Sequence, residues 1–305
     1  MCIRIEKRGD TGMWLGLACA SALFAGVTAI LAKIGVKNTD STLATAIRTA
    51  VVLAFSWLLV FITGAQAGIA AVDGRSWLFL VLSGLATGSS WLCYFKALQL
   101  GDVNQVTPVD KTSTLLTILL AFFLLGEPIT PIKGAGAAVI AVGTWLMAVK
   151  KEEGTPAEKA GETGKGKRGW FLFAALSAVF ASLTSILGKI GIEGVDSNLG
   201  TAVRTGVVLV MAWFMVFLSG KQRELGRIDG RSWCFILLSG VTTGLSWLCY
   251  YRALQEGPAS VVVPIDKLSI LVTVAFSRLF LRERLTARAA AGLALITAGT
   301  LLLLV

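Results

Sequence analysis

The stretch FAGVTAILAKIG, residues 24–35, returns 156 positions later as FASLTSILGKIG, residues 180–191. The correspondence extends over residues 14–149 and 170–305 without a gap, and 65 of the 136 paired positions are identical. Self-similarity at a fixed offset indicates a duplicated structural unit. The segment between the copies, residues 150–168, is charged and glycine-rich and is predicted to be a flexible hydrophilic linker.

The composition of the chain is that of a membrane protein. Of its 305 residues, 55% are hydrophobic and only 15% are charged, whereas about a quarter of a typical soluble domain is charged. The apolar residues come in blocks long enough to cross a bilayer as helices, which takes about 20 residues each. Ten such spans are predicted, at 13–36, 42–63, 77–98, 104–125, 130–149, 169–191, 198–219, 232–254, 260–281 and 286–305.

The odd number of spans in each copy determines the architecture. After five crossings the second copy enters the membrane from the opposite side, so the two copies are inverted, as in many secondary transporters. We therefore expect an all-α polytopic membrane protein of ten transmembrane helices. Its parts are an N-terminal tail at 1–12, a five-helix repeat at 13–149, the linker at 150–168 and an inverted five-helix repeat at 169–305. The first span is too long for a removable signal peptide.

Basic residues in the loops bear on the orientation, because short cytoplasmic loops are enriched in Lys and Arg. The linker has six basic residues, which favours a cytoplasmic linker, whereas Arg4, Lys7 and Arg8 favour the reverse. The loops after the second and fourth spans differ between the copies, as inversion predicts; random divergence of surface loops is the alternative. These loops carry Arg75 and Lys133 in the first copy, and Lys221, Arg223, Arg227, Arg231, Arg282, Arg284 and Arg288 in the second.

Each copy also carries the same six charged positions within or beside its spans. Ionisable groups in a membrane span usually face the bundle interior and mark a substrate or ion route. We expect the two sets to line one pathway, although the lysines near helix ends can also extend to the interface and the arginines in the second spans can be structural. The sets are Lys33, Asp40, Arg48, Lys96, Asp110 and Lys111, and Lys189, Asp196, Arg204, Arg252, Asp266 and Lys267.

Within these sets, the motifs PVDK at 108–111 and PIDK at 264–267 are the hardest to explain structurally. Neighbouring residues point about 100° apart on a helix, so the Asp and Lys of one motif cannot simply neutralise each other. Each needs a partner on another helix, a water-filled cavity or a ligand. We therefore expect both motifs to lie near the centre of the pathway.

Aromatic and small residues accompany the charges. Trp91 and Tyr94, matched by Trp247 and Tyr250, lie one helical turn apart and form either a wall of the substrate pocket or part of the interfacial aromatic belt. Small residues spaced four apart allow helices to approach closely, and we expect this role for Gly84 and Gly88, and for Gly240 and Gly244.

These residues bring out a family resemblance. Each copy resembles an EamA unit of the drug/metabolite transporter superfamily, in the arginine of its second span (TAIRTAVVL with Arg48, TAVRTGVVL with Arg204) and in the run YFKALQLGDVNQVTPVDKTSTLLTILLAFFLLGE at 94–127. The leucine-rich close of that run, Gly126–Glu127, departs to Arg282–Glu283 in the second copy. The resemblance covers nearly the whole chain.

The resemblance implies a ten-helix carrier with a central cavity between inverted halves. Its members move amino acids, metabolites, drugs or nucleotide-linked sugars, often outward and often coupled to protons, and most have cytoplasmic termini. Relatives that expel lipophilic cations use a glutamate in the first span. This chain has Lys33 in its first span instead, which disfavours cationic drugs.

The leading functional hypothesis is a secondary active transporter that exports a small polar metabolite, anionic or zwitterionic, across a bacterial-type cytoplasmic membrane, as a functional monomer in the lipid bilayer. Each set holds four basic and two acidic groups, which favours such cargo. The chain has no histidine, so proton coupling would have to use Asp110, Asp266, Asp40 or Asp196. The alternatives are an exporter of multiple drugs or cationic compounds, and a channel or a flippase of lipid-linked substrates.

Other classes of protein are disfavoured. The sequence has no H-E-x-x-H or G-x-S-x-G motif, and without histidine most nucleophile–base arrangements are impossible, so an enzyme is not expected. The five cysteines show no paired metal-ligand spacing. We expect no metal, no cofactor and no nucleic-acid partner.

Overall fold

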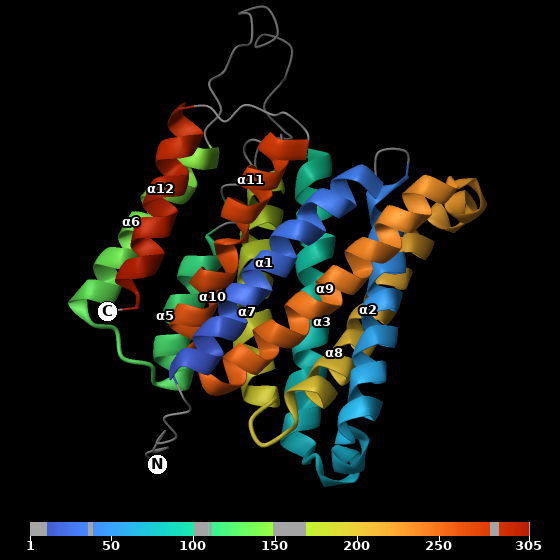
Figure 1. The fold of residues 1–305 in the computed structure, drawn as a ribbon, viewed down its shortest axis with the longest axis horizontal. Coiled ribbons are helices and arrows are strands. Elements are labelled where there is room, and N and C mark those ends of the chain that lie inside the picture. Colours follow the sequence, from blue (N-terminus) through green and yellow to red (C-terminus); the bar gives the residue numbers. More distant parts are fainter. Residues whose placement is uncertain are drawn as a thin grey trace, which may run out of the picture.

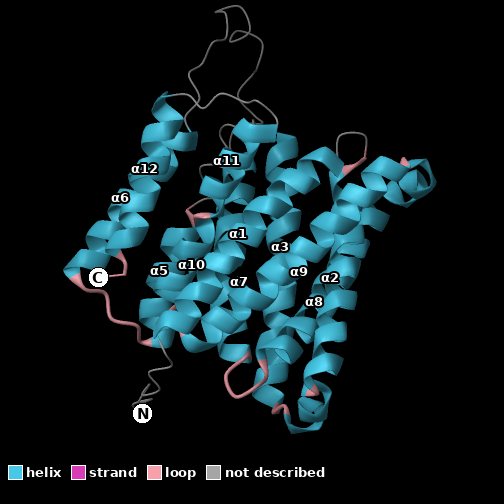
Figure 2. Ribbon diagram, viewed as in Figure 1, coloured by secondary structure: helices cyan, strands magenta, loops and turns pink. Residues whose placement is uncertain are grey.

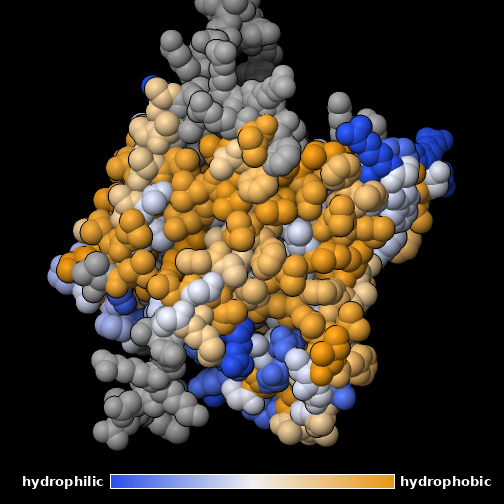
Figure 3. Space-filling model, viewed as in Figure 1, coloured by the Kyte–Doolittle hydropathy of each residue, from blue (hydrophilic) through white to orange (hydrophobic). Residues whose placement is uncertain are grey.

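The computed structural model describes residues 11–35, 39–100, 109, 112–148, 169–280 and 287–304. Within these ranges every regular element is a helix and no strand occurs (Figure 2), which confirms the predicted fold class. Apolar side chains cover the middle of the molecule, and hydrophilic ones gather towards its ends (Figure 3). Several large apolar side chains are more than half exposed on this surface, Phe123 at 74% and Val210 at 70% among them, as expected of a surface that faces lipid.

The two repeats contain corresponding helices (Figure 1). The first consists of α1 (Thr11–Gly35), α2 (Ser41–Thr63), the 3₁₀ helix η1 (Ala65–Ala71), α3 (Gly74–Leu100), α5 (Ser113–Leu125) and α6 (Pro131–Ala148). The second consists of α7 (Gly169–Gly191), α8 (Ser197–Leu218), the 3₁₀ helix η3 (Lys221–Arg227), α9 (Gly230–Glu256), α10 (Ala259–Lys267), α11 (Ser269–Phe280) and α12 (Ala287–Leu302).

These helices account for the ten predicted spans in the described part of the chain. Seven helical segments are long and apolar enough to cross a membrane, and three shorter apolar helices stand at the positions of the other predicted spans. The short ones are Ser113–Leu125, Pro131–Leu146 and Ala290–Leu302. The protein is therefore a multi-pass integral membrane protein built from two repeats.

The ninth span differs from the prediction of one continuous helix over 260–281. It is interrupted at Leu268, between α10 and α11, where the backbone N–H of Leu268 donates to the carbonyl of Ile265, a 3₁₀-type bond, at 2.9 Å. Pro264 lies inside α10 and has no N–H, so the helix loses one internal hydrogen bond there. The interruption leaves Asp266 and Lys267 at the end of a helix instead of in its middle.

The direction of the cross-repeat contacts establishes the inversion. In α1 and α9, Ser21 bonds to Ser246 and Thr28 bonds to Thr242, so the two helices run antiparallel. Helix α9 is the counterpart of α3, which is two crossings after α1 and runs parallel to it (Figure 1). The second repeat therefore runs opposite to the first. Helices α3 and α7 pack in the same antiparallel manner, since Ser83 bonds to Thr184 and Ser90 bonds to Ser177.

The two repeats also contact each other closely at glycines. A Cβ atom at Gly84 or Gly88 of α3 would come within 2.6 Å of α8, and one at Gly240 or Gly244 of α9 within 2.8 Å of α2. Helices α6 and α12 also pack against each other, where a Cβ at Gly143 would lie 2.7 Å from the carbonyl of Gly292. All these contacts join the two repeats, as expected for small residues in membrane helices.

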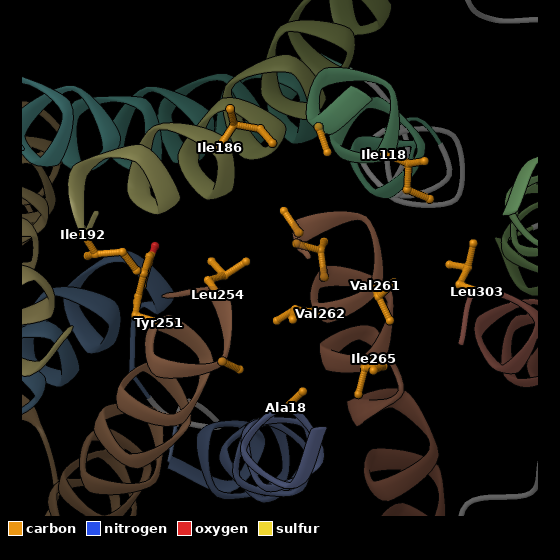
Figure 4. Packing of buried hydrophobic residues seen from close by; sticks show 14 of the residues in the cluster. Ala18, Ile118, Ile186, Ile192, Tyr251, Leu254, Val261, Val262, Ile265 and Leu303 are labelled. Carbon is orange, nitrogen blue, oxygen red and sulfur yellow. The ribbon is translucent and has the colours of Figure 1, made fainter. Parts of the chain in front are cut away.

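The two ends of the molecule differ. We call the end at which α1 begins and α12 ends the termini end, and the opposite end, at which α6 ends and α7 begins, the linker end (Figure 1). The main apolar cluster lies between α1, α5, α7, α9 and α10 (Figure 4). Its buried residues include Ile118, Ile186, Val261, Val262 and Ile265.

Candidate functional site

A cavity of about 290 Å³ lies between the two repeats. Its lining residues come from the linker-end halves of α3 and α7, from the start of α5 and from the end of α10. The cavity therefore lies on the linker-end side of the apolar cluster. The residues are Ser90, Trp91 and Tyr94 of α3, Ser113 of α5, Ser177 and Ala181 of α7, and Lys267 of α10.

The chemistry of this lining is mixed. Four serine and tyrosine hydroxyls offer both donors and acceptors, the indole of Trp91 offers an apolar face, and Lys267 supplies a cationic side chain. Lys267 is exposed, so its ammonium group is reached from solvent. The arrangement suits a small polar molecule that carries a negative group.

A polar seam joins the repeats beside the cavity. Ser90 donates to the carbonyl of Ser177 at 3.0 Å, and at the symmetry-related place Ser246 donates to the carbonyl of Ser21 at 3.1 Å. The hydroxyl of Ser21 also donates to Asp266 Oδ1 at 2.7 Å. Asp266, next to the cavity residue Lys267, thus has its partner on the other repeat.

Arg204 of α8 is buried at the interface with the first repeat, with 2% of its surface exposed. Its Nε donates to Ser83 at 3.0 Å and its Nη2 donates to Thr87 at 2.7 Å. The guanidinium carbon lies 4.7 Å from the ring centroid of Tyr251 and 5.0 Å from that of Trp247. The remaining Nη1 atom has no hydrogen-bond partner in the described part of the chain. Through these contacts Arg204 joins the second repeat to the first.

Arg48 of α2, the counterpart of Arg204, has a different environment. It is half-buried, and its Nη2 lies 3.4 Å from the hydroxyl of Thr243. Its Nε has no hydrogen-bond partner among the residues that the structure describes. The two arginines occupy equivalent positions in sequence, so the difference shows that the two halves are not in the same conformation.

The aromatic pairs differ in the same way. Trp91 and Tyr94 line the cavity, whereas Trp247 and Tyr250 pack against the main apolar cluster. The hydroxyl of Tyr250 bonds to that of Ser185 at 2.8 Å. The structure thus has one aromatic pair at a cavity and its counterpart in packed surroundings.

The other predicted site residues that the structure describes are not among the residues that line the cavity. Asp40 caps α2 by accepting the backbone N–H of Thr42 at 3.0 Å, and Asp196 caps α8 by accepting that of Asn198 at 2.9 Å, so both carboxylates serve as helix N-caps. Lys96 is exposed, and Arg252 pairs with Glu256 on its own helix at 2.7 Å. Asp110, Lys111 and the side chain of Lys33 lie outside the described residues. A pathway-lining role for this group stays a prediction.

Glu127 makes contacts between the repeats that the sequence did not predict. It is 7% exposed, accepts two backbone hydrogen bonds from the start of α10 and pairs with Lys189 at 3.4 Å. One signal was available: a glutamate recurs at the equivalent position 283, although its neighbour changes from Gly126 to Arg282. Lys189, predicted to line the pathway, is thus part of an ion pair between the repeats.

The comparisons with known proteins agree with this architecture. The model of the EamA-like transporter family matches residues 12–149 and 168–305. A protein of Sinorhizobium sp., named an uncharacterized transporter in the cobO 3′ region, is 44% identical over 136 residues, which are 45% of this chain and 96% of that protein. A Methanocaldococcus jannaschii protein is 30% identical over 132 residues, 43% of this chain and 93% of that protein. Both relatives are therefore about as long as one repeat.

Longer matches cover both repeats. A protein of Archaeoglobus fulgidus, named an uncharacterized transporter, is 24% identical over 237 residues, 76% of this chain and 78% of that protein. A solved crystal structure superposes with a TM-score of 0.73 and 19% identity over 94% of this chain and 95% of that one. This likeness shows a shared fold.

Proposed function

This chain belongs to the EamA-like transporter family, and from that premise we propose that it is a secondary active transporter of a small polar metabolite, anionic or zwitterionic, that works by alternating access. The observation that carries the proposal is the cavity between the inverted repeats. Both repeats line it, and Lys267 places a cation in its wall. An ammonium group in such a place attracts a carboxylate or another anionic group of the substrate.

The asymmetry of the two halves supports a carrier in preference to a channel. On the linker-end side the aromatic pair Trp91 and Tyr94 lines a cavity. On the termini-end side the pathway is filled by the apolar cluster, with Val262 and Ile186 fully buried. A carrier has such a closed side at every stage of its cycle, because its two repeats rock about a central site. In the opposite state the pair Trp247 and Tyr250 would line the cavity.

The cation in the cavity wall also argues against cationic cargo. A positively charged drug next to Lys267 would meet like-charge repulsion. No acidic side chain is among the described residues that line the cavity. A cationic exporter is therefore the weaker alternative.

Proton coupling is assigned to Asp266 among the described carboxylates. It bonds to Ser21 of the first repeat at 2.7 Å and stands next to Lys267, whereas Asp40 and Asp196 are engaged as helix N-caps. Replacing Asp266 by Asn and measuring proteoliposome uptake under an imposed pH gradient tests this assignment. The gradient dependence should disappear. Retained gradient dependence in the Asp266→Asn protein would refute the role of this residue.

The test of the proposed function starts from purified protein screened by thermal shift against a library of amino acids, organic acids and phosphorylated metabolites. Compounds that stabilise the protein are then used in counterflow with proteoliposomes. We expect saturable exchange of an anionic or zwitterionic compound. Flux that rises linearly with concentration, without counterflow, would indicate a channel, and exchange restricted to organic cations would indicate the alternative cargo. We place the protein in the cytoplasmic membrane as a functional monomer, in which the two repeats take the place of two subunits.

A further inference from the structure

The carboxylate of Glu127 holds the start of helix α10 from the opposite repeat. Its Oε1 accepts the backbone N–H of Ala259 at 2.7 Å, and its Oε2 accepts that of Ser260 at 2.9 Å. The first N–H groups of a helix have no partner within the helix. The residue before Ala259 is Pro258, which provides no side-chain cap. Glu127 thus supplies from the first repeat the cap that α10 lacks.

Lys189 extends this contact to two further helices. Its ammonium group lies 3.4 Å from Glu127 Oε1 and donates to the carbonyl of Gly257, the residue that ends α9. We call Glu127, Lys189, Gly257, Ala259 and Ser260 the cross-repeat clasp. It joins the end of α5 in the first repeat to α7, α9 and α10 in the second.

The turn after α5 explains why Glu127 reaches this place. Gly126 adopts a left-handed conformation, with φ of 67°, and the backbone N–H of Glu127 donates to the carbonyl of Ala121 at 3.2 Å. A left-handed glycine at this position ends the helix and turns the chain away from its axis. The Gly–Glu pair is therefore one device: the glycine turns the chain, and the glutamate caps the neighbouring helix.

The clasp and the cavity lie at two different levels along the same helices. Ala181 and Lys189 are eight residues apart on α7, and Ala259 and Lys267 are eight apart on α10, which is about 12 Å along each helix. Between the two levels lie Ile186, Val262 and Ile265 of the apolar cluster (Figure 4). The clasp thus secures the closed end of the pathway.

We propose that the cross-repeat clasp is the gate on the termini-end side, and that Glu127 is the residue that positions α10 against the first repeat while the cavity is accessible from the linker end. This inference rests on the proposed function. Opening the termini-end side requires α10 to move away from α5, and the contacts of Glu127 resist that movement. Loss of the carboxylate should shift the equilibrium between the two facings by about tenfold, because a buried charged acceptor of two hydrogen bonds is lost.

The test uses two reporter cysteines, one at each level, in full-length protein whose five native cysteines are replaced by alanine. Val261→Cys reports on the closed side, where Val261 is 3% exposed, and Ala181→Cys reports on the cavity. The protein is reconstituted in nanodiscs and labelled with a charged thiol reagent. Adding Glu127→Gln should speed labelling at position 261 by about tenfold and leave labelling at position 181 the same or slightly slower, because the facing that exposes position 261 is the minor one.

Two further variants sharpen the test. Glu283→Gln changes the glutamate at the equivalent sequence position and serves as the matched control, for which labelling at position 261 should not rise. Lys189→Met removes the ammonium group and leaves the Glu127 carboxylate in place, so it should speed labelling at position 261 by a smaller factor. If Glu127→Gln does not yield folded protein, the Lys189→Met variant still tests whether the clasp controls access.

Several results would overturn the gate. Unchanged labelling at both positions would show that the clasp does not control access. Faster labelling at both positions would show a general loosening of the helices instead of a change of facing. Because labelling needs no substrate, the two proposals can fail separately. If the labelling rates change as expected but no metabolite is transported, only the proposed function is refuted. If a metabolite is transported but Glu127→Gln leaves the labelling rates unchanged, only the gate is refuted.

Discussion

The Nη2 atom of Arg204 lies 2.7 Å from the hydroxyl of Thr87, and this contact joins the second repeat to the first. The counterpart of this pair, Arg48 with Thr243, is separated by 3.4 Å. Arg204 is buried between two aromatic rings, whereas Arg48 is half-buried. The contact between α8 and α3 is therefore tighter than the equivalent contact between α2 and α9, although the local sequences are nearly the same.

Replacing Arg204 by Lys should destabilise the protein more than replacing Arg48 by Lys. A lysine cannot reproduce the two hydrogen bonds of the guanidinium group or its stacking on both rings. We expect Arg204→Lys to lower the free energy of unfolding by roughly 2–3 kcal/mol, and Arg48→Lys by less than about 1 kcal/mol. Unfolding of the detergent-solubilised protein followed by tryptophan fluorescence measures both. Equal losses would contradict the asymmetry of the two contacts.

Replacing Lys267 by Met should weaken binding of an anionic or zwitterionic substrate without unfolding the protein. The side chain is exposed at the cavity, so the loss falls on the ligand instead of on the fold. We expect the dissociation constant to rise about tenfold to a hundredfold, as for one charge-assisted hydrogen bond. Isothermal titration with the compound found by thermal shift provides the measurement. Lys133→Met, on α6 and outside the cavity lining, is the control, and equal weakening by both variants would rule out a specific role for Lys267.

The inverted architecture predicts that η1 and η3 are reached from opposite sides of the membrane. Ala70 and Gly226 are equivalent positions and both are exposed. The side of η3 carries Lys221, Arg223 and Arg227, and basic loops favour the cytoplasm. In intact cells an impermeant maleimide should therefore label Ala70→Cys directly and Gly226→Cys only after permeabilisation. Labelling of both from one side would refute the inversion, and the reverse order would refute only the orientation.

Asp73 and Asp229 accept backbone hydrogen bonds at the starts of α3 and α9, and these two caps predict a pH dependence of stability. The hydroxyl and the backbone N–H of Ser76 donate to Asp73 and hold the pKa of its carboxyl below the ordinary value, and Ser232 does the same for Asp229. A lowered folded-state pKa means that this stability is present above the unfolded pKa of about 3.9 and is lost as the pH falls through the folded pKa. Asp73→Ala should lower the Tm at pH 7, and the difference should shrink below about pH 4. The substitution Glu193→Ala, at an exposed position, is the control. A difference that stays constant with pH would exclude the charged cap.

Much of the fold could be predicted from the sequence by itself. The offset of 156 residues established the duplication, the apolar blocks established the spans, and the odd number of spans in each copy required the inversion. Asp40 and Asp196 could be assigned as N-caps because capping depends on residues only two or three positions away. These features depend on composition and on local spacing, which a sequence contains in full.

Only the tertiary structure decided which residues meet and which half of the molecule is closed. Glu127 bonds to an α10 backbone more than 130 positions away, and no local pattern in the chain indicates that contact. Arg48 and Arg204 stand in nearly identical sequences, yet one is half-buried and the other is buried. The physical reason is that burial and hydrogen-bond partners are set by how the two repeats pack, and two copies of one sequence adopt different environments when the repeats close at one end and leave a cavity towards the other.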